Sequence, residues 1–380
     1  MEGARPGDLG RAVHQPPGDV GPLSGPSAHP PLPRRLGNAD RCRLVKFGVV
    51  IPNHGPFGDR GAIRELITAA EDLGFDTAWF GDHVVIPDYA KNLSHPNWFD
   101  ALACCIFGAG LTSRLRFGTD VLVLPYRNPV VLSQLVAGAD QLSDGRITLG
   151  VGVGYISGEF AALGTPPYDE RGAITDEYLE VLRALWSADG AVSHHGRYIN
   201  FDDVHASPAP LQQPFPLWVG GNNPRGLRRA ALLGNGWHPL FPTPEEYAAG
   251  RSRILATRDE FGLDQPFAFS FSCPGVAVLD PGAPRATPLS YDDFPDIPAE
   301  YRYAPPFPTT ADGRTRFVGS AEEVAADIAD YAAAGVEHLA LRFWTADPTA
   351  RVADVLAQFE RFAREVTPLC VGRSRDAAPS

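Results

Sequence analysis

The sequence predicts an α/β protein folded as a single (β/α)8 TIM barrel, and three observations support this fold class. In the segment 116–160, an apolar strand, a helix and a second apolar strand follow one another with short connections, which is typical of a parallel pair with a right-handed crossover. The same alternation recurs along the chain and gives eight strands and eight helices, which favours a closed barrel over an open doubly wound sheet. The length of 380 residues accommodates one such barrel or two smaller domains.

The individual elements are predicted from apolar periodicity and from the turn and capping residues at their ends. Strands are predicted at 46–51, 77–80, 116–124, 147–151, 217–220, 236–240, 267–279 and 337–343. Helices are predicted at 61–73, 98–111, 130–142, 168–186, 224–233, 244–261, 320–334 and 348–366, and a hairpin at 191–201. No internal repeat is visible in this order of elements.

Particular residues support several of these elements. Ser320 and Glu323 form a capping box at the start of the helix at 320–334. Pro274 and Gly275 are expected to bend or end the strand at 267–279. The helix at 130–142 is predicted to bury one stripe, made of Leu132, Leu135, Val136 and Ala139. On the helix at 98–111, Trp98 and Phe107 are expected in the core.

The barrel is predicted to cover residues 45–370, with an insertion at 280–310 before the last strand and helix. Residues 1–44 are rich in Pro and Gly and lack apolar periodicity, so a disordered N-terminal extension is predicted there, and a disordered tail at 371–380. One interpretation is that the native chain starts near Val45. The insertion carries aromatic residues that could form a lid over the barrel mouth, or it is an ordinary surface loop.

Composition excludes several classes of partner. The net charge is −12 and no Lys/Arg-rich run occurs, which argues against nucleic acid and anionic membranes. No apolar run approaches the ~18 residues of a membrane span. The five cysteines show neither a CxxC pair nor zinc spacing, so no metal site is predicted, and reduced thiols in the cytoplasm are expected.

Candidate site residues lie where the predicted strands end, because TIM barrels carry their active sites at the carboxyl ends of strands. Asp82 and His83 follow the second strand, and an imidazole beside a carboxylate can donate or relay a proton near neutral pH. The alternative is a histidine that only caps the loop. Asp120 is an acid inside an apolar strand. It must lie at a bulge or strained peptide that faces a cavity, or its oxygens must meet backbone donors.

Two glycine-containing segments are candidates for cofactor binding. Gly152 and Gly154 end the fourth strand, where they allow a ligand to approach the backbone closely or simply ease packing. Gly220, Gly221 and Asn222 precede a helix that begins with Pro224. Free amides and the positive helix end would suit a phosphate there, and the alternative is a plain strand-to-helix turn.

Five blocks of residues resemble the bacterial luciferase-like monooxygenase superfamily, and within it the branch that uses the deazaflavin coenzyme F420. The blocks are GDH at 81–83, GTDVLVLPYRNP at 118–129, ADQLSDGRITLGVGVGY at 139–155, ERG at 170–172 and WVGGNNPRGLRRAALLGNGWHP at 218–239. Together they are specific for the superfamily, and much less specific for the cofactor and the substrate.

The resemblance implies a non-proline cis peptide in the third strand that backs the cofactor ring, at Asp120-Val121. It also implies that His83 lies near the reactive face of the ring, and that Gly154, Tyr155, Gly220 and Gly221 lie near the ribityl phosphate. The chain departs from the sugar-phosphate dehydrogenases of this branch, which place an acidic glutamate where this chain has Tyr155. That departure puts a sugar-phosphate substrate in doubt.

The resemblance leaves several functions open. The favoured one is F420-dependent hydride transfer to or from a small organic substrate, with His83 exchanging the proton. The alternative is an FMN-dependent monooxygenase that uses reduced flavin and oxygen. A flavin-binding barrel without turnover is disfavoured by Asp82 and His83. A glycosidase would need two carboxylates from Asp82, Asp120 and Glu159. A homodimer is expected by resemblance only.

Overall fold

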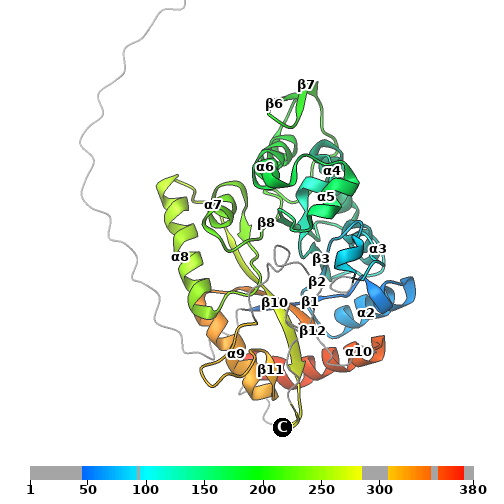
Figure 1. Cartoon of the computed structure of the whole chain (residues 1–380), viewed down its shortest axis with the longest axis vertical. Helices are drawn as coiled ribbons and strands as arrows, with labels where there is room; N and C mark the ends of the chain where they lie inside the picture. Colours follow the sequence, from blue (N-terminus) through cyan, green and yellow to red (C-terminus); the bar gives the residue numbers. More distant parts are fainter. Residues whose placement is uncertain (1–44, 92–94, 285–306, 344–349, 372–380) are drawn as a thin grey trace, which may run out of the picture. The chain divides into compact units, whose positions relative to one another are not determined.

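The computed structural model describes residues 45–91, 95–284, 307–343 and 350–371. The predicted extension at 1–44, most of the predicted insertion and the predicted tail lie outside the described residues. Within the described residues, eight parallel strands pair side by side into a closed sheet, so the predicted (β/α)8 barrel is confirmed. Figure 1 shows the arrangement of these strands and of the helices.

The strands follow the predicted order with small shifts at their ends. They are β1 (Lys46–Val50), β2 (Thr77–Phe80), β3 (Arg116–Thr119), β4 (Leu122–Val123), β5 (Ile147–Gly152), β8 (Leu217–Val219), β9 (Gly236–Trp237), β10 (Ala268–Val278) and β12 (His338–Phe343). β3 and β4 are two halves of one predicted strand, and both pair with β5. β9 pairs with β10, β10 with β12, and β12 with β1, which closes the ring. The short strand β11 (Val318–Gly319) pairs in parallel with the end of β10.

Helices cover the outside of the barrel. They are α2 (Arg60–Asp72), α3 (Ala101–Ala109), α4 (Pro129–Leu142), α5 (Ser157–Leu163), α6 (Arg171–Ser187), α7 (Pro224–Leu233), α8 (Pro244–Glu260), α9 (Ala321–Ala334), α10 (Val352–Arg361) and α11 (Thr367–Val371). Successive helices contact one another around the ring, and α10 returns to α2. The predicted hairpin is present as β6 (Val192–His195) and β7 (Asn200–Val204).

Three details differ from the predictions. α3 begins at Ala101 because the Asp100 side chain caps it by accepting from the Ala103 amide, so Trp98 lies outside the helix. Leu135 does not belong to the buried stripe of α4, since 41% of it is exposed. The other three residues of the predicted stripe, Leu132, Val136 and Ala139, are buried. The short helix α5 was not predicted.

Two tryptophans fill the inside of the barrel. Trp79 and Trp218 point inward with ring centroids 5.4 Å apart. Strand glycines make room for them, because an added Cβ at Gly118 would lie 2.3 Å from Trp79 and one at Gly236 would lie 2.2 Å from Trp218. Trp79 in turn stacks on His238, with centroids 4.8 Å apart. This packing fixes His238 at the end of β9, on the side of the barrel where the strands end.

Candidate active site

The connection between β3 and β4 is the centre of the candidate site. The peptide bond between Asp120 and Val121 is cis, as the resemblance implied. The Val121 side chain enters a space that nearby glycines leave open, because an added Cβ at Gly152 would lie 2.7 Å from Val121 Cγ2. An added Cβ at Gly220 would also contact Val121, at 3.8 Å. Packing against Val121 therefore explains part of the glycine pattern at the end of β5.

Asp120 is buried and is held by three side chains. Its Oδ1 lies 2.9 Å from His238 Nε2, and its Oδ2 accepts from Ser272 Oγ at 3.1 Å and from Arg342 Nη2 at 2.7 Å. Of the two alternatives for Asp120, the one with backbone donors to its oxygens is therefore ruled out, since side chains of β10 and β12 and the His238 imidazole take that place. Burial alone would raise the pKa of Asp120, but the His238 hydrogen bond and the Arg342 charge lower it below its ordinary value.

His83 is paired with Glu159 and not with Asp82. His83 Nδ1 lies 2.7 Å from Glu159 Oε2, and Tyr155 Oη lies 3.3 Å from His83 Nε2. Glu159 is fully buried, on helix α5 in the loop that follows β5. The two residues are 76 positions apart in the chain, so local sequence could not show the pair.

The hydrogen bonds around Glu159 fix the tautomer of His83. Glu159 accepts from the amides of Val84 at 3.0 Å and Val85 at 3.3 Å, and from Tyr126 Oη at 3.0 Å. Because its other partners all donate to it, the carboxylate also accepts a hydrogen bond from His83 Nδ1–H. In the neutral imidazole, Nε2 then carries the lone pair, and the Tyr155 hydroxyl donates to it. Burial, followed by the Glu159 charge, raises the pKa of Tyr126 and keeps that hydroxyl protonated.

Asp82 is buried and is committed to Arg127, a residue that the sequence analysis did not single out. The two form a bidentate pair with both distances at 2.7 Å, and Asp82 also accepts from the Val123 amide at 2.8 Å. Arg127 contacts Asp100 as well, at 2.7 Å. The predicted Asp82–His83 acid–base pair is therefore not formed, because Asp82 instead holds the chain at β4 next to the cis peptide.

Aromatic side chains line the mouth of the barrel near His83. Trp98 stacks on His54 with centroids 4.2 Å apart and meets the edge of His83 at 4.8 Å. The expectation that Trp98 belongs to the core is therefore wrong. Burial, followed by the Arg342 charge, lowers the pKa of His54 to about 4, so this imidazole is neutral at physiological pH.

The predicted phosphate-binding segment lies at the start of α7. Gly221 has a φ of 101°, which favours glycine, and the segment Gly221–Asn223 is exposed. Asn223 caps the helix by accepting from the Gly226 amide at 2.8 Å, and Asn222 donates to the Leu240 carbonyl at 2.6 Å. Gly154 also has a positive φ, of 78°, and an added Cβ there would lie 2.6 Å from Val123.

Metal clusters and membrane-spanning helices are both absent from the described residues. No group of three or more His, Cys, Asp and Glu side chains in the described part of the chain could hold a metal ion. No helix in that part combines the length and the apolar character that crossing a membrane requires.

Curated relatives of the chain include a dehydrogenase and several uncharacterized proteins. It is 34% identical to an F420-dependent glucose-6-phosphate dehydrogenase of Amycolatopsis mediterranei over 48% of this chain and 53% of that protein. This chain thus spans about half the length of that relative. It is 32% identical to an uncharacterized protein of Mycobacterium tuberculosis over 60% of this chain and 78% of that protein.

Solved structures with the same fold include a dehydrogenase and a monooxygenase. An F420-dependent secondary alcohol dehydrogenase in complex with an F420-acetone adduct superposes with a TM-score of 0.67 and 21% identity, over 86% of this chain and 99% of the other. The monooxygenase RslO1 of Streptomyces bottropensis gives a TM-score of 0.66 and 22% identity, over 85% and 99%. The model of the luciferase-like monooxygenase family matches residues 45–338. The chain therefore belongs to the luciferase-like monooxygenase family.

Proposed function

We propose that the protein is an oxidoreductase that transfers a hydride between coenzyme F420 and a small organic substrate. The similarity to an F420-dependent dehydrogenase supports the choice of cofactor. The observation that carries the proposal is the Glu159–His83–Tyr155 chain at the strand ends, because it leaves one imidazole lone pair ready to exchange a proton. An FMN-dependent monooxygenase is the second candidate, and the similarity to a solved monooxygenase favours it.

The residues at the barrel mouth fit a ring cofactor with an anionic tail. Asp120 and Val121 would back the ring, and Gly152, Gly154 and Tyr155 would lie beside it. Gly220, Gly221 and Asn222 would receive the phosphate at the start of α7. The space next to Gly221 supports this fit, because an added Cβ would meet only the Cα of Gly226 within 4 Å. When bound, F420 supplies a ring carbon that accepts or gives up a hydride.

His83 is proposed to exchange the proton. When an alcohol is oxidised, its O–H bond breaks as the C–H bond gives up the hydride. The hydroxyl proton then passes to the Tyr155 oxygen while the Tyr155 proton moves to His83 Nε2. Glu159 stays ionised and holds the protonated imidazole through Nδ1, so we assign it as a positioning residue. Reduction of a carbonyl substrate runs through the same atoms in reverse.

We assign supporting roles to the two aspartates. Asp120 would hold Arg342 beside the ring, and the guanidinium would favour negative charge that develops there. Asp82 is proposed to order the segment 123–127 through Arg127 and the Val123 amide, and not to exchange protons itself. Both roles follow from groups that are already paired in the structure.

The cofactor is tested by titrating the purified protein with F420 and, separately, with FMN, following fluorescence. We expect micromolar binding of F420 and much weaker binding of FMN. Tight FMN binding with no F420 binding would replace the first candidate with the monooxygenase.

The role of Glu159 is tested with Glu159→Gln, followed by oxidation of small alcohols such as 2-propanol with F420. We expect kcat to fall about 10- to 100-fold, because the amide no longer fixes the tautomer of His83, while the Kd for F420 stays within a few-fold. Glu180→Gln, on the exposed face of α6, is the matched control and should behave as the wild type. An unchanged kcat and pH profile in Glu159→Gln would remove the residue from the reaction.

A further inference from the structure

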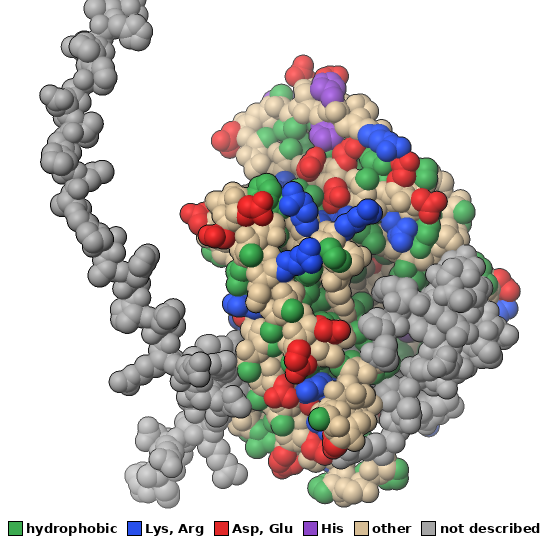
Figure 2. Space-filling model, turned by 60° about the vertical axis from the view of Figure 1, so that its left-hand side comes forward, with side chains coloured by type: hydrophobic (Ala, Val, Ile, Leu, Met, Phe, Trp, Pro, Cys, Tyr) green, Lys and Arg blue, Asp and Glu red, His purple; other side chains and the backbone are tan. Residues whose placement is uncertain are grey.

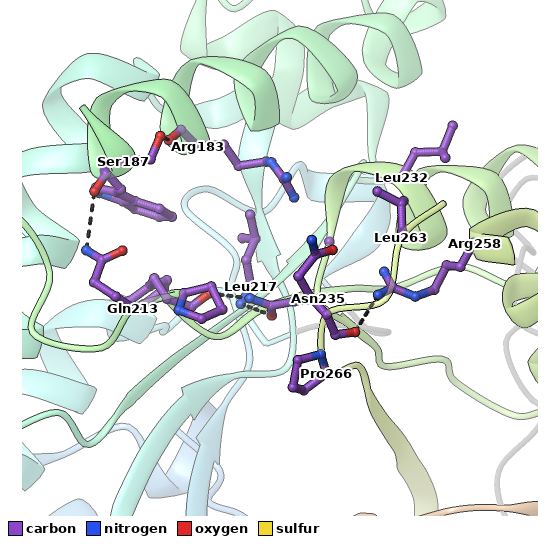
Figure 3. A pocket seen from close by; sticks show the side chains of 14 residues that line it. Arg183, Ser187, Gln213, Leu217, Leu232, Asn235, Arg258, Leu263 and Pro266 are labelled. Carbon is purple, nitrogen blue, oxygen red and sulfur yellow. Dashed lines mark hydrogen bonds between the residues drawn. The ribbon is translucent and has the colours of Figure 1, made fainter. Parts of the chain in front are cut away.

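A cleft lies at the end of the barrel opposite the candidate active site. It has a volume of about 170 Å³ and is formed where α6, α7 and α8 end and where β8, β9 and β10 begin (Figure 3). The proposed reaction makes no use of this cleft. Arg183 and Arg258 extend toward its middle from opposite sides. Figure 2 shows that Lys and Arg side chains also gather in the middle of one face of the molecule.

The cleft carries positive charge that no carboxylate among its lining residues balances. Two arginines line it, and no Asp or Glu does. Arg258 is only 6% exposed, and among the described residues neither Arg258 nor Arg183 forms an ion pair. Burial lowers the pKa of Arg258, and the Arg183 charge lowers it further, more than the exposed Asp264 raises it. The two guanidinium groups therefore repel each other without a carboxylate between them.

Contacts with backbone carbonyls and helix ends offset only part of this positive charge. Arg183 Nη1 donates to the Leu233 carbonyl at 3.0 Å, and Arg258 donates to the carbonyls of Ala231 at 3.3 Å and Gln265 at 2.6 Å. A helix end is equivalent to roughly −0.5 of a charge, so three converging ends supply at most about −1.5 against the two arginines. The cleft therefore keeps a positive potential and unused N–H donors on both guanidinium groups.

The floor of the cleft is apolar. Trp186 and Phe215 lie with ring centroids 4.7 Å apart beside Leu217. Two of the three amide side chains that line the cleft already have partners, because Gln213 donates to the Trp186 carbonyl and Asn235 donates to the Phe215 carbonyl. A cavity of about 150 Å³ holds a benzene ring, so this cleft has room for one ring or a branched chain of that size.

We propose that this cleft binds a small organic anion with a carboxylate and a ring-sized apolar body. The carboxylate would lie between Arg183 and Arg258, since guanidinium groups bind carboxylates in a bidentate manner. The apolar body would rest on Trp186 and Phe215. The site is separate from the barrel mouth and does not depend on the identity of the cofactor.

The test is calorimetry on the full-length protein with benzoate as the probe. Benzyl alcohol serves as its neutral counterpart, and inorganic phosphate as an anion without an apolar body. We expect benzoate to bind at least about tenfold more tightly than either, because only benzoate satisfies both the arginines and the aromatic floor. Saturating F420 should leave benzoate binding unchanged.

Variants locate the binding. Arg183 is exposed, so Arg183→Ala should fold normally and weaken benzoate at least about tenfold, whereas Arg253→Ala on the exposed face of α8 should not. Phe215→Leu should weaken benzoate and leave phosphate unchanged. The proposal is overturned by no benzoate binding at millimolar concentration, by equal binding in Arg183→Ala, or by phosphate binding as tightly as benzoate. Competition by F420 would overturn it as well.

Discussion

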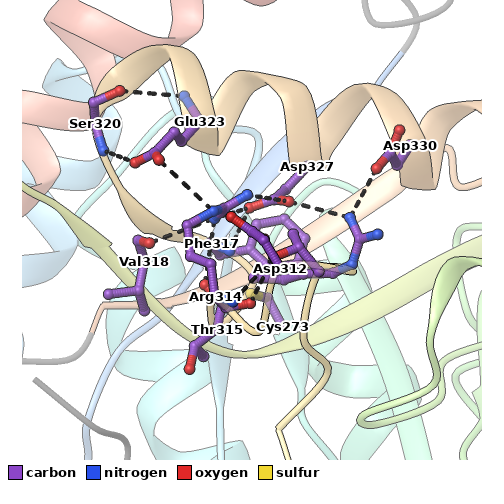
Figure 4. A network of polar contacts seen from close by, with 12 residues as sticks. Cys273, Asp312, Arg314, Thr315, Phe317, Val318, Ser320, Glu323, Asp327 and Asp330 are labelled. Carbon is purple, nitrogen blue, oxygen red and sulfur yellow. Dashed lines mark hydrogen bonds and ion pairs between the residues drawn. The ribbon is translucent and has the colours of Figure 1, made fainter. Parts of the chain in front are cut away.

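Asp120 and Asp327 are two of the buried aspartates that hold arginines, and their surroundings differ. Asp327 on α9 accepts from Arg314 at 2.7 and 2.8 Å, from Arg316 at 3.1 Å and from the Phe317 amide at 2.7 Å (Figure 4). The side chains of both arginines are at most 10% exposed. Every partner of Asp327 is a permanent donor, and the group is closed to solvent.

Asp120 has an equally buried side chain, but its partners are of another kind. One is the buried imidazole of His238, and another is Arg342, whose side chain is 40% exposed at the barrel mouth. The closed group around Asp327 can only stabilise the fold, whereas the open group around Asp120 can also meet a ligand. Burial of a charged pair alone therefore does not identify a functional site, and the accessibility of its partners does.

The largest effect on stability is expected for Asp327→Asn. Two buried guanidinium groups would lose their counter-charge, so the free energy of unfolding should fall by about 3–5 kcal/mol. Urea denaturation measures this loss. The fraction that remains folded should bind F420 as the wild type does. A loss below about 1 kcal/mol would show that the Asp327 group is not the closed structural network described here.

Asp120→Asn should reduce stability less than Asp327→Asn and should weaken F420 binding. Arg342 can turn to solvent when the charge is removed, so we expect the free energy of unfolding to fall by only about 1–3 kcal/mol. Affinity for F420 should fall at least about tenfold, as measured by fluorescence titration. Asp140→Asn is the matched control, since Asp140 is buried and bound to Gln212 at the other end of the barrel. Equal F420 affinity in both variants would contradict the role given to Asp120.

Acid stability tests the link between Arg342 and His54. The pKa of His54 is lowered from 6.5 to about 4, so the unfolded chain binds the extra proton first. The contribution of neutral His54 to stability is complete above about pH 6.5 and is lost as the pH falls to about 4. The loss in the free energy of unfolding amounts to about 3 kcal/mol at most. Urea denaturation of His54→Gln between pH 6.5 and 4 should therefore show a smaller decrease in the free energy of unfolding than the wild type.

His338 provides the comparison, because burial, followed by the Lys46 charge, lowers its pKa to about 4 as well. Arg342→Gln should reduce the acid-dependent loss of stability that is due to His54 and leave the loss that is due to His338 unchanged. If Arg342→Gln left the loss due to His54 unchanged as well, Arg342 would not act on His54.

The smallest effect is expected for Asp330→Asn. The Asp330 side chain is 54% exposed and meets Arg316 at 2.8 Å, while Arg316 keeps its contact with Asp327. The free energy of unfolding should therefore change by less than about 1 kcal/mol in the same urea assay. A loss as large as that of Asp327→Asn would mean that the closed network extends to the surface.

Local sequence signals predicted the scaffold well. β2 and α7 have the predicted bounds, and the capping box of Ser320 and Glu323 is present. These features depend on neighbouring residues, so periodicity and capping rules reveal them. The prediction of the cis peptide at Asp120 came from the resemblance, whereas the predicted end of the second strand already placed His83 at the barrel mouth.

The partners of the site residues could not be predicted in the same way. Glu159 reaches His83 from α5, a helix of seven residues that is too short to show periodicity. Arg127 reaches Asp82 across 45 positions. Both pairs depend on how loops meet above the barrel, which no local pattern records. The exposure of Leu135 has a different cause, because α4 carries more apolar residues than the core contacts.

The most direct test of the proposed reaction is His83→Ala, measured by F420 binding and by F420-dependent oxidation of 2-propanol and related small alcohols. Binding should stay within a few-fold of the wild type, because the residues proposed to hold the ring and its tail are untouched. Turnover should fall at least about 100-fold, because the proton of the substrate loses its acceptor. Wild-type turnover in His83→Ala would contradict the account.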